Sequence, residues 1–186
     1  MLSDPLVLAF ETSTATGGVA LVSKKGVLAE ELSSQQKLHS ELLHKQIFFC
    51  LKKAGKSLSD VTHFAVDRGP GSFTGIRVSG NTGKTLSWIL NKPLVMVDSL
   101  RVLAQQNKGL KLPILCMVNA YKNMVYWCKY DADGTPITSP SVIQVQSLEE
   151  IVDRPMICIG DGWLAYQQFF PPAIRIHLIR PDRPFD

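Results

Sequence analysis

The chain has few cysteines, and none of them forms a pair at metal-ligand spacing. Cys50, Cys116, Cys128 and Cys158 lie far apart in a sequence of 186 residues, with no C-x-x-C pair among them. A structural zinc site or a dithiol redox site is therefore not indicated. Three of the four cysteines lie in apolar runs, so we expect buried thiols, as is usual in a reducing cytoplasm.

The sequence also lacks long apolar runs and a large excess of either charge. No apolar run approaches the ~18 residues that cross a bilayer, and residues 1–5 carry no basic residue of the kind that opens a signal peptide. We therefore expect a cytoplasmic protein without membrane contact. Lys and Arg number 20 against 16 Asp and Glu, and the net charge of +4 is spread without a basic run. This is weak support for direct binding of nucleic acid.

Common catalytic patterns are missing as well. There is no G-x-S-x-G nucleophile elbow. The segment Gly80–Thr85 resembles the end of a P-loop, but Val78 occupies the position five residues before Gly83 where that motif requires glycine. His39 and His44 stand at i, i+5, so they do not share a helix face as metal-binding histidines at i, i+4 do. We predict no catalytic residue, no metal site and no cofactor.

The sequence does contain a glycine-rich loop between a predicted strand and a predicted helix. Three of the 13 glycines fall within seven residues of the segment 68–77, around one proline. Residues 62–66 are mostly apolar and β-branched, as in a strand, and residues 74–90 fit a helix. Glycine lets a partner approach closely, and a helix N-terminus favours an anion. The loop therefore predicts contact with a phosphate or a closely docked partner, although Pro-Gly pairs also form ordinary tight turns.

A turn rich in hydroxyl groups follows the first predicted strand, Leu6–Glu11. This strand is apolar at nearly every position, which predicts burial on both faces. Residues 12–18 form the turn, and residues 19–24 and 27–32 then form a hairpin. The same order opens the actin, sugar-kinase and heat-shock chaperone ATPases, where the turn faces nucleotide phosphates, whereas by spacing alone it also fits a plain hairpin. We interpret the nucleotide site as vestigial. The residues that we expect to face it are Glu11, Thr12, Ser13, Thr14, Gly69, Gly71 and Ser72.

The predicted helix Lys37–Ala54 carries two apolar stripes instead of one. A helix lying on a single sheet needs one stripe, and we assign that role to Leu43, Ile47, Cys50, Leu51 and Ala54. The helix at 74–90 places small residues along one face, where another backbone can approach. We therefore predict that both helices pair with those of a partner, so that Leu42→Glu and Gly83→Leu abolish association but not folding. The predicted interface consists of Leu38, Leu42, Phe49, Arg77, Ser79, Gly80, Gly83 and Ser87.

The second half of the sequence repeats the first in a loose form, with paired strands, a helix and another strand that ends in glycine. The segment 107–109 is the best candidate for a boundary. We expect an α/β protein with a first domain over residues 1–105, built on a five-stranded mixed sheet, and a smaller, incomplete second domain over residues 106–186.

Three segments together resemble the TsaB (YeaZ) family. They are Gly69–Arg77 (G-P-G-S-F-T-G-I-R), Phe10–Thr14 (F-E-T-S-T) and His39–Leu43 (H-S-E-L-L), in matching order and spacing. The resemblance covers roughly residues 6–130. It implies two domains of the actin-like ATPase fold, the second one short here, and a non-catalytic protein that dimerises with and activates TsaD.

The resemblance also implies the functional context. TsaD transfers threonylcarbamoyl to the tRNA adenosine next to the anticodon. The implied partners are a TsaD-type subunit, a TsaE-type ATPase in the same complex, a second copy of the chain when it is alone, and tRNA indirectly. TsaD holds a metal with an H-x-x-x-H pair, and residues 98–103 (D-S-L-R-V-L) lack histidine at the corresponding place. An ATP-dependent kinase or a metallopeptidase-like enzyme of the same superfamily is the alternative.

Overall fold

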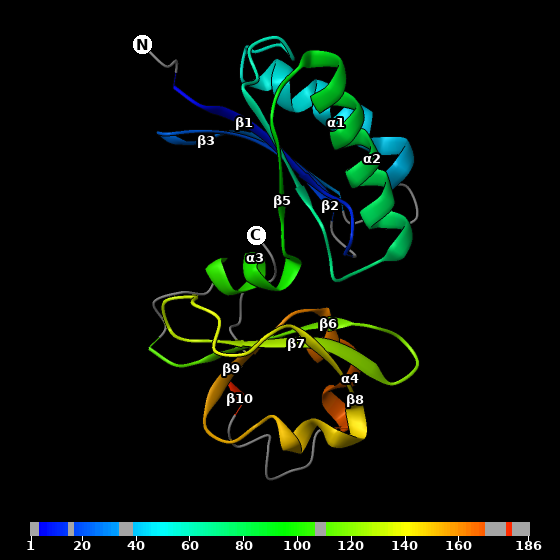
Figure 1. The fold of residues 1–186 in the computed structure, drawn as a ribbon, viewed down its shortest axis with the longest axis vertical. Coiled ribbons are helices and arrows are strands. Elements are labelled where there is room, and N and C mark those ends of the chain that lie inside the picture. Colours follow the sequence, from blue (N-terminus) through cyan, green and yellow to red (C-terminus); the bar gives the residue numbers. More distant parts are fainter. Residues whose placement is uncertain (1–3, 15–16, 34–38, 107–110, 170–177, 180–186) are drawn as a thin grey trace. The chain divides into compact units, whose positions relative to one another are not determined.

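The chain divides into two compact units, residues 1–98 and 99–186, each with its own sheet (Figure 1). The computed structural model describes residues 4–14, 17–33, 39–106, 111–169 and 178–179, so the expected boundary segment 107–109 lies outside the described residues. We expected the first domain to end at residue 105, but the division falls after residue 98. The reason is that α3 (Ser99–Gln106) buries Leu100 and Leu103 in the core of the second unit.

The first unit contains a five-stranded sheet in the order β3-β2-β1-β4-β5. Strand β1 pairs antiparallel with β2 and parallel with β4, and β4 pairs parallel with β5. This confirms the expected five-stranded mixed sheet. The strands are β1 (Leu6–Glu11), β2 (Gly17–Ser23), β3 (Gly26–Ser33), β4 (His63–Asp67) and β5 (Leu94–Val97).

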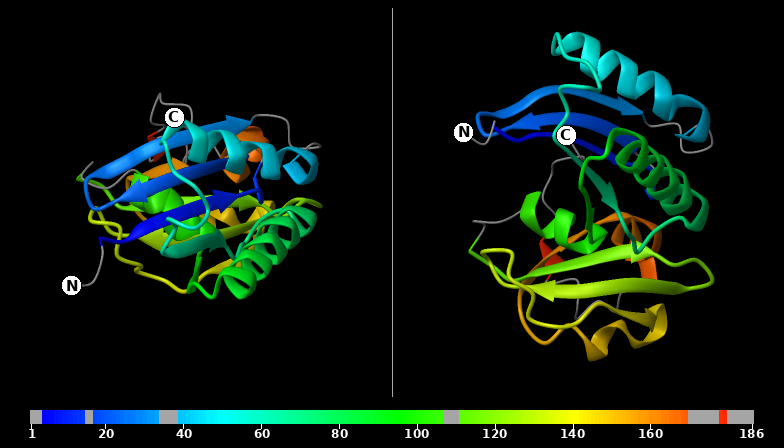
Figure 2. Two further views of the ribbon diagram at one scale, coloured as in Figure 1. Left: turned by 90° about the horizontal axis from the view of Figure 1, so that it is seen from above. Right: turned by 45° about the horizontal axis from the view of Figure 1, so that its top comes forward.

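Two helices, α1 (His39–Lys53) and α2 (Phe73–Leu90), cover the same face of this sheet (Figures 1 and 2). The covered face buries Leu8 and Phe10 of β1, whereas Val7 and Ala9 on the opposite face are half-buried. The expected burial of β1 on both faces is therefore wrong, since both helices of this unit lie on one side. The strand alternates in the way that a sheet with one covered face requires.

Local sequence signals set the end of α1 and the beginning of α2. Gly55 follows α1 with a positive φ of 62°, and the amide of Lys56 donates to the carbonyl of Leu51 at 2.9 Å. This is the glycine stop that the sequence predicted. Helix α2 begins after Ser72, whose hydroxyl accepts from the amide of Gly75 at 3.3 Å.

The second unit repeats the strand arrangement of the first. Its sheet has the order β10-β9-β6-β7-β8, in which β6 takes the place of β1, with β7 antiparallel on one side and β9 parallel on the other. This repeat bears out the expected similarity of the two halves. The strands are β6 (Ile114–Asn119), β7 (Met124–Tyr130), β8 (Ser141–Gln144), β9 (Met156–Ile159) and β10 (Leu178–Ile179).

Each face of the second sheet has its own core. One core contains α3 with Ile114 and Cys116, and the other contains η2 (Val145–Glu150) and α4 (Asp161–Tyr166) with Leu115 and Met117. A short 3-10 turn, η3 (Gln167–Phe169), follows α4. Neighbouring residues of β6 therefore point into different cores, as the period of two of a strand dictates.

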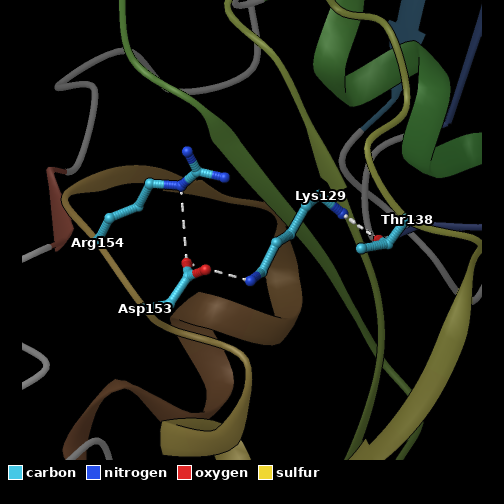
Figure 3. A network of polar contacts seen from close by, with 4 residues as sticks. All are labelled: Lys129, Thr138, Asp153 and Arg154. Atoms are coloured by element: carbon cyan, nitrogen blue, oxygen red, sulfur yellow. Dashed lines mark hydrogen bonds and ion pairs between the residues drawn. The ribbon is translucent and has the colours of Figure 1, made fainter.

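A polar network ties β7 to the segment that follows η2 (Figure 3). The ammonium of Lys129 lies 3.2 Å from the carboxylate of Asp153, which also lies 3.7 Å from the guanidinium of Arg154. The backbone amide of Lys129 donates to the hydroxyl of Thr138 at 3.0 Å. The two cationic partners explain why the pKa of Asp153 lies below its ordinary value, with the hydrogen bond from Lys129 as the largest cause.

Candidate functional site

The site lies where two neighbouring parallel strands of the first sheet end. Phe10 of β1 is in register with Val66 of β4. The last residues of these strands, Glu11 and Asp67, therefore lie side by side at the same edge of the sheet. In open α/β sheets this carboxyl edge is the place where ligands bind. Both of the predicted loops start here, the hydroxyl-rich turn after β1 and the glycine-rich loop after β4.

The hydroxyl-rich turn closes around the carboxylate of Glu11. One oxygen, Oε1, accepts from the backbone amides of Ser13 and Thr14, the latter at 2.9 Å, and from the hydroxyl of Ser13 at 2.6 Å. The other oxygen accepts from the hydroxyl of Thr14 at 3.2 Å. A turn with this set of donors suits an anion, and here the anion is supplied by the chain itself.

A second carboxyl group, that of Asp67, shares the hydroxyl of Ser13 with Glu11. Asp67 also accepts from the amide of Gly69 at 2.7 Å. Burial raises the pKa of Glu11 above its ordinary value, and the charge of Asp67 raises it further, while hydrogen bonds from Ser13 and Thr14 act in the opposite direction. The cluster therefore links β1, the turn and the glycine loop.

The glycine loop lies directly against the turn. The amide of Ser72 donates to the carbonyl of Ser13 at 2.7 Å, and the buried hydroxyl of Thr12 donates to the carbonyl of Gly75 at 2.7 Å. A Cβ on Gly75 would lie 1.8 Å from the carbonyl oxygen of Thr12, and one on Gly71 would lie 2.8 Å from Ser13. Only glycine permits such an approach of two backbones. The loop contains a cis peptide bond between Gly69 and Pro70.

The structure thus brings all seven residues of the predicted vestigial site together in one region. Sequence reasoning missed two further members, Asp67 and the glycine at position 75. Asp67 could have been found as an acidic residue directly after a strand and before the loop, and Gly75 as the last glycine of the motif. The donors of the 12–14 turn are occupied by Glu11, which distinguishes this turn from one that is open to a phosphate.

Two further acids near strand ends, Asp98 and Asp161, have partners of their own. Asp98 lies 3.8 Å from the guanidinium of Arg68. Asp161 accepts from the amide of Asn119 at 2.9 Å, and burial raises its pKa above the ordinary value. Within the described ranges, no three side chains of the types that bind metal ions gather closely enough to hold one.

The stripe of α1 that we assigned to its own sheet lies against that sheet. Leu43, Ile47, Cys50 and Leu51 are buried against the sheet, and Ala54 is partly buried beside them. On the other side of the helix Leu42 is half-buried and Phe49 is 49% exposed. Leu38 lies outside the described residues.

Phe48 is a further exposed aromatic residue of α1 that sequence reasoning missed. Its side chain is 59% exposed and contacts Phe49 edge to face, with ring centroids 5.5 Å apart. The ammonium of Lys52 lies 6.0 Å from the centroid of the Phe48 ring. Aromatic residues are enriched in protein interfaces relative to the rest of the surface.

The small residues of α2 are explained largely by the sheet of their own unit. A Cβ on Gly83 would lie 2.6 Å from Cγ1 of Val66 and 3.1 Å from Cδ1 of Leu94, and Ser79 is fully buried with its hydroxyl on the carbonyl of Gly75 at 3.4 Å. Contact with a partner is therefore not needed to explain the small size of Ser79 and Gly83. Small residues here let α2 approach the sheet.

The remaining predicted interface residues of α2 differ among themselves. A Cβ on Gly80 would meet nothing within 4 Å. The hydroxyl of Ser87 donates to the carbonyl of Lys92 at 2.6 Å, which helps to close the end of the helix. The guanidinium of Arg77 stacks on the ring of Phe73 at 4.9 Å from its centroid, and that ring is 73% exposed.

The two repeated sheets and the joined loops define a protein of the actin-like ATPase fold. The structure of the ethanolamine utilization protein EutJ from Carboxydothermus hydrogenoformans is similar with a TM-score of 0.57 at 10% identity, covering 99% of this chain and 87% of that one. The structure of YeaZ from Pseudomonas aeruginosa is similar with a TM-score of 0.79 at 28% identity, covering 90% of this chain and 80% of that one. These likenesses confirm the predicted fold.

The chain belongs to the TsaB (YeaZ) family. It is 33% identical to the tRNA threonylcarbamoyladenosine biosynthesis protein TsaB of Buchnera aphidicola over 87% of this chain and 80% of that protein. The TsaB of Bacillus subtilis is 29% identical over 90% of this chain and 76% of that protein. Residues 26–173 match the model of the TsaD family, described as tRNA N6-adenosine threonylcarbamoyltransferase. The resemblance seen in the sequence is thereby confirmed.

None of the helices in the described part of the chain is both long enough and apolar enough to cross a membrane.

Proposed function

We propose that this chain is a non-catalytic subunit that binds and activates a TsaD-type enzyme, which transfers threonylcarbamoyl to the tRNA adenosine next to the anticodon. The names of the TsaB relatives place them in the biosynthesis of this modification. The proposed complex forms in the cytoplasm, includes a TsaE-type ATPase and involves tRNA only indirectly. Alone, the chain pairs with a second copy of itself.

The observation that carries the proposal is the exposed stripe of α1. The helix already covers its sheet with the stripe from Leu43 to Leu51, so Phe48 and Phe49 have no role in that core. Leu42, seven residues before Phe49 on the same helix face, is half-buried. A side chain of this kind contributes roughly 1.5–3 kcal/mol when it is fully buried, and interface energy is concentrated in a few such aromatic residues.

The geometry of the joined loops supports the non-catalytic part of the proposal. In an actin-like ATPase the turn after the first strand has to accept a phosphate. Here Glu11 occupies the donors of Ser13 and Thr14, and its negative charge and that of Asp67 disfavour another anion at the same place. The loops serve instead to hold α2 and the sheet together beside the proposed interface.

The test is a binding titration with the TsaD-type subunit of the same organism, combined with reconstituted tRNA modification. Phe49→Glu places a charge in the proposed interface, and we expect binding to weaken at least about tenfold, since 1.4 kcal/mol corresponds to a factor of ten. Val27→Glu is the matched control, because Val27 is an exposed apolar residue (63%) of the same unit on β3. Equal binding by the two variants contradicts the interface.

A separate measurement tests the absence of catalysis. The isolated chain is expected to hydrolyse ATP no faster than buffer containing magnesium. Magnesium-dependent turnover that disappears in Glu11→Gln contradicts this part of the proposal and favours the enzyme alternative. The two tests are independent, so an error about the interface and an error about catalysis give different results.

A further inference from the structure

Two cysteines of the second unit lie directly opposite each other on neighbouring strands. Cys116 of β6 and Cys128 of β7 are register partners in an antiparallel pair, and β6 and β7 run side by side in Figure 1. Both residues are fully buried and belong to the same core, the one that α3 covers. Their side chains therefore leave the sheet on the same face.

The backbone pattern shows which kind of pair this is. The amide of Ile137 donates to the carbonyl of Lys129, and the amide of Lys129 donates to Thr138, so the backbone of Lys129 faces away from β6. The backbone amide and carbonyl of its neighbour Cys128 therefore face β6. Cys116 and Cys128 form a pair whose backbones are hydrogen-bonded to each other. In such a pair the Cα atoms lie about 5.5 Å apart, within the range of about 4.4–6.8 Å that a disulfide spans.

We propose that Cys116 and Cys128 are a thiol pair that an oxidant of the diazene or disulfide class converts into a cross-strand disulfide. In this step the two S–H bonds break and one S–S bond forms, and two protons and two electrons pass to the oxidant. A diazene is thereby reduced to the corresponding hydrazine. The inference is independent of the function proposed above.

The other two cysteines are excluded by their positions. Cys158 lies on β9 next to β6, but it belongs to the core on the opposite face of the sheet, with Leu115 and Met117. Cys50 belongs to the first unit, where its thiol donates to the carbonyl of Ala29 at 3.4 Å.

Closing the disulfide requires a change of partner at Cys128. In the structure its thiol donates to the carbonyl of Thr138 at 3.1 Å, on the side away from β6. The side chain has to turn about its Cα–Cβ bond to reach Cys116. Oxidation therefore removes the thiol donor of the Thr138 carbonyl. The hydroxyl of Thr138 accepts a hydrogen bond from the amide of Lys129 (Figure 3). Because closure gives up the hydrogen bond from Cys128 to Thr138, we expect dithiothreitol to reverse it readily.

The experiment uses the full chain in its native state. The protein is treated with diamide, then unfolded and alkylated with N-ethylmaleimide, and its mass and non-reduced peptides are measured. We expect one link, between Cys116 and Cys128, with alkylated Cys50 and Cys158 and full reversal by dithiothreitol. The same treatment in urea, where the strand register is lost, is expected to give a mixture of pairs.

Single variants provide matched controls. Cys116→Ala and Cys128→Ala are expected to give no intramolecular link, whereas Cys50→Ala and Cys158→Ala still give it. Four alkylated cysteines in the native wild-type protein after diamide treatment overturn the proposal, and so does a link that includes Cys50 or Cys158. Because the decisive measurement is made on the wild-type chain, a variant that fails to fold does not affect it.

Discussion

Two glycines of the same helix are expected to respond in opposite ways to a single methyl group. A Cβ on Gly75 would lie 1.8 Å from the backbone oxygen of Thr12, whereas a Cβ on Gly80 would meet no atom within 4 Å. Gly80 lies in the interior of α2, where alanine gains about 0.8–1 kcal/mol of helix propensity over glycine, and Gly75 in the first turn gains no more than this. The difference between Gly75→Ala and Gly80→Ala therefore isolates the contact between the glycine loop and the turn.

The size of the effect follows from this contact. Gly75→Ala forces α2 away from the turn, and overpacking of this kind typically costs about 1–3 kcal/mol. It also strains the buried hydrogen bond from Thr12 to the carbonyl of Gly75, which is worth a further 0.5–1.5 kcal/mol or so. After the gain in propensity, we expect a net destabilisation of about 1–3 kcal/mol for Gly75→Ala and a stabilisation of up to about 1 kcal/mol for Gly80→Ala.

The assay is urea unfolding of both variants and the wild type, monitored by circular dichroism at constant pH. For a chain of this size, 1 kcal/mol corresponds to roughly 2–4 °C in Tm, so thermal melts provide a second measurement. The order of stability should be Gly80→Ala, then wild type, then Gly75→Ala. If Gly75→Ala is as stable as Gly80→Ala, then the two loops do not lie in contact.

Further predictions concern the same region. The pKa of Glu11 is raised in the folded state, so its contribution to stability is present below its unfolded pKa and is lost as the pH rises through the folded value. The urea midpoint of Glu11→Gln should therefore fall less between pH 4 and pH 8 than that of the wild type. Parallel curves of midpoint against pH contradict this prediction. Thr12→Val removes the hydroxyl that donates to the carbonyl of Gly75, so we expect a loss of about 0.5–1.5 kcal/mol in urea unfolding. Gly83→Leu should lower the melting temperature strongly, because its side chain collides with Val66; a folded variant that merely loses its partner would support our original expectation instead.

Local sequence patterns determined much of this protein. The order of strands and helices, the stop of α1 at Gly55 and the buried stripe of α1 could all be predicted, because turn residues and apolar periodicity act over a few neighbouring positions. The family could be read from the segment Gly69–Arg77, since a run of nine matching residues is specific. The seven residues that we predicted to face a vestigial nucleotide site could be named because they lie at or after the ends of two strands.

Only the tertiary structure decided how these parts are used. Whether the turn after β1 is open to an anion or filled from within depends on where the carboxylate of Glu11 lies, and sequence spacing does not report this. The small face of α2 could serve a partner or its own sheet, and the contacts of Gly83 with Val66 and Leu94 decided for the sheet. Both questions depend on groups that are distant in the sequence, and close packing alone brings such groups together.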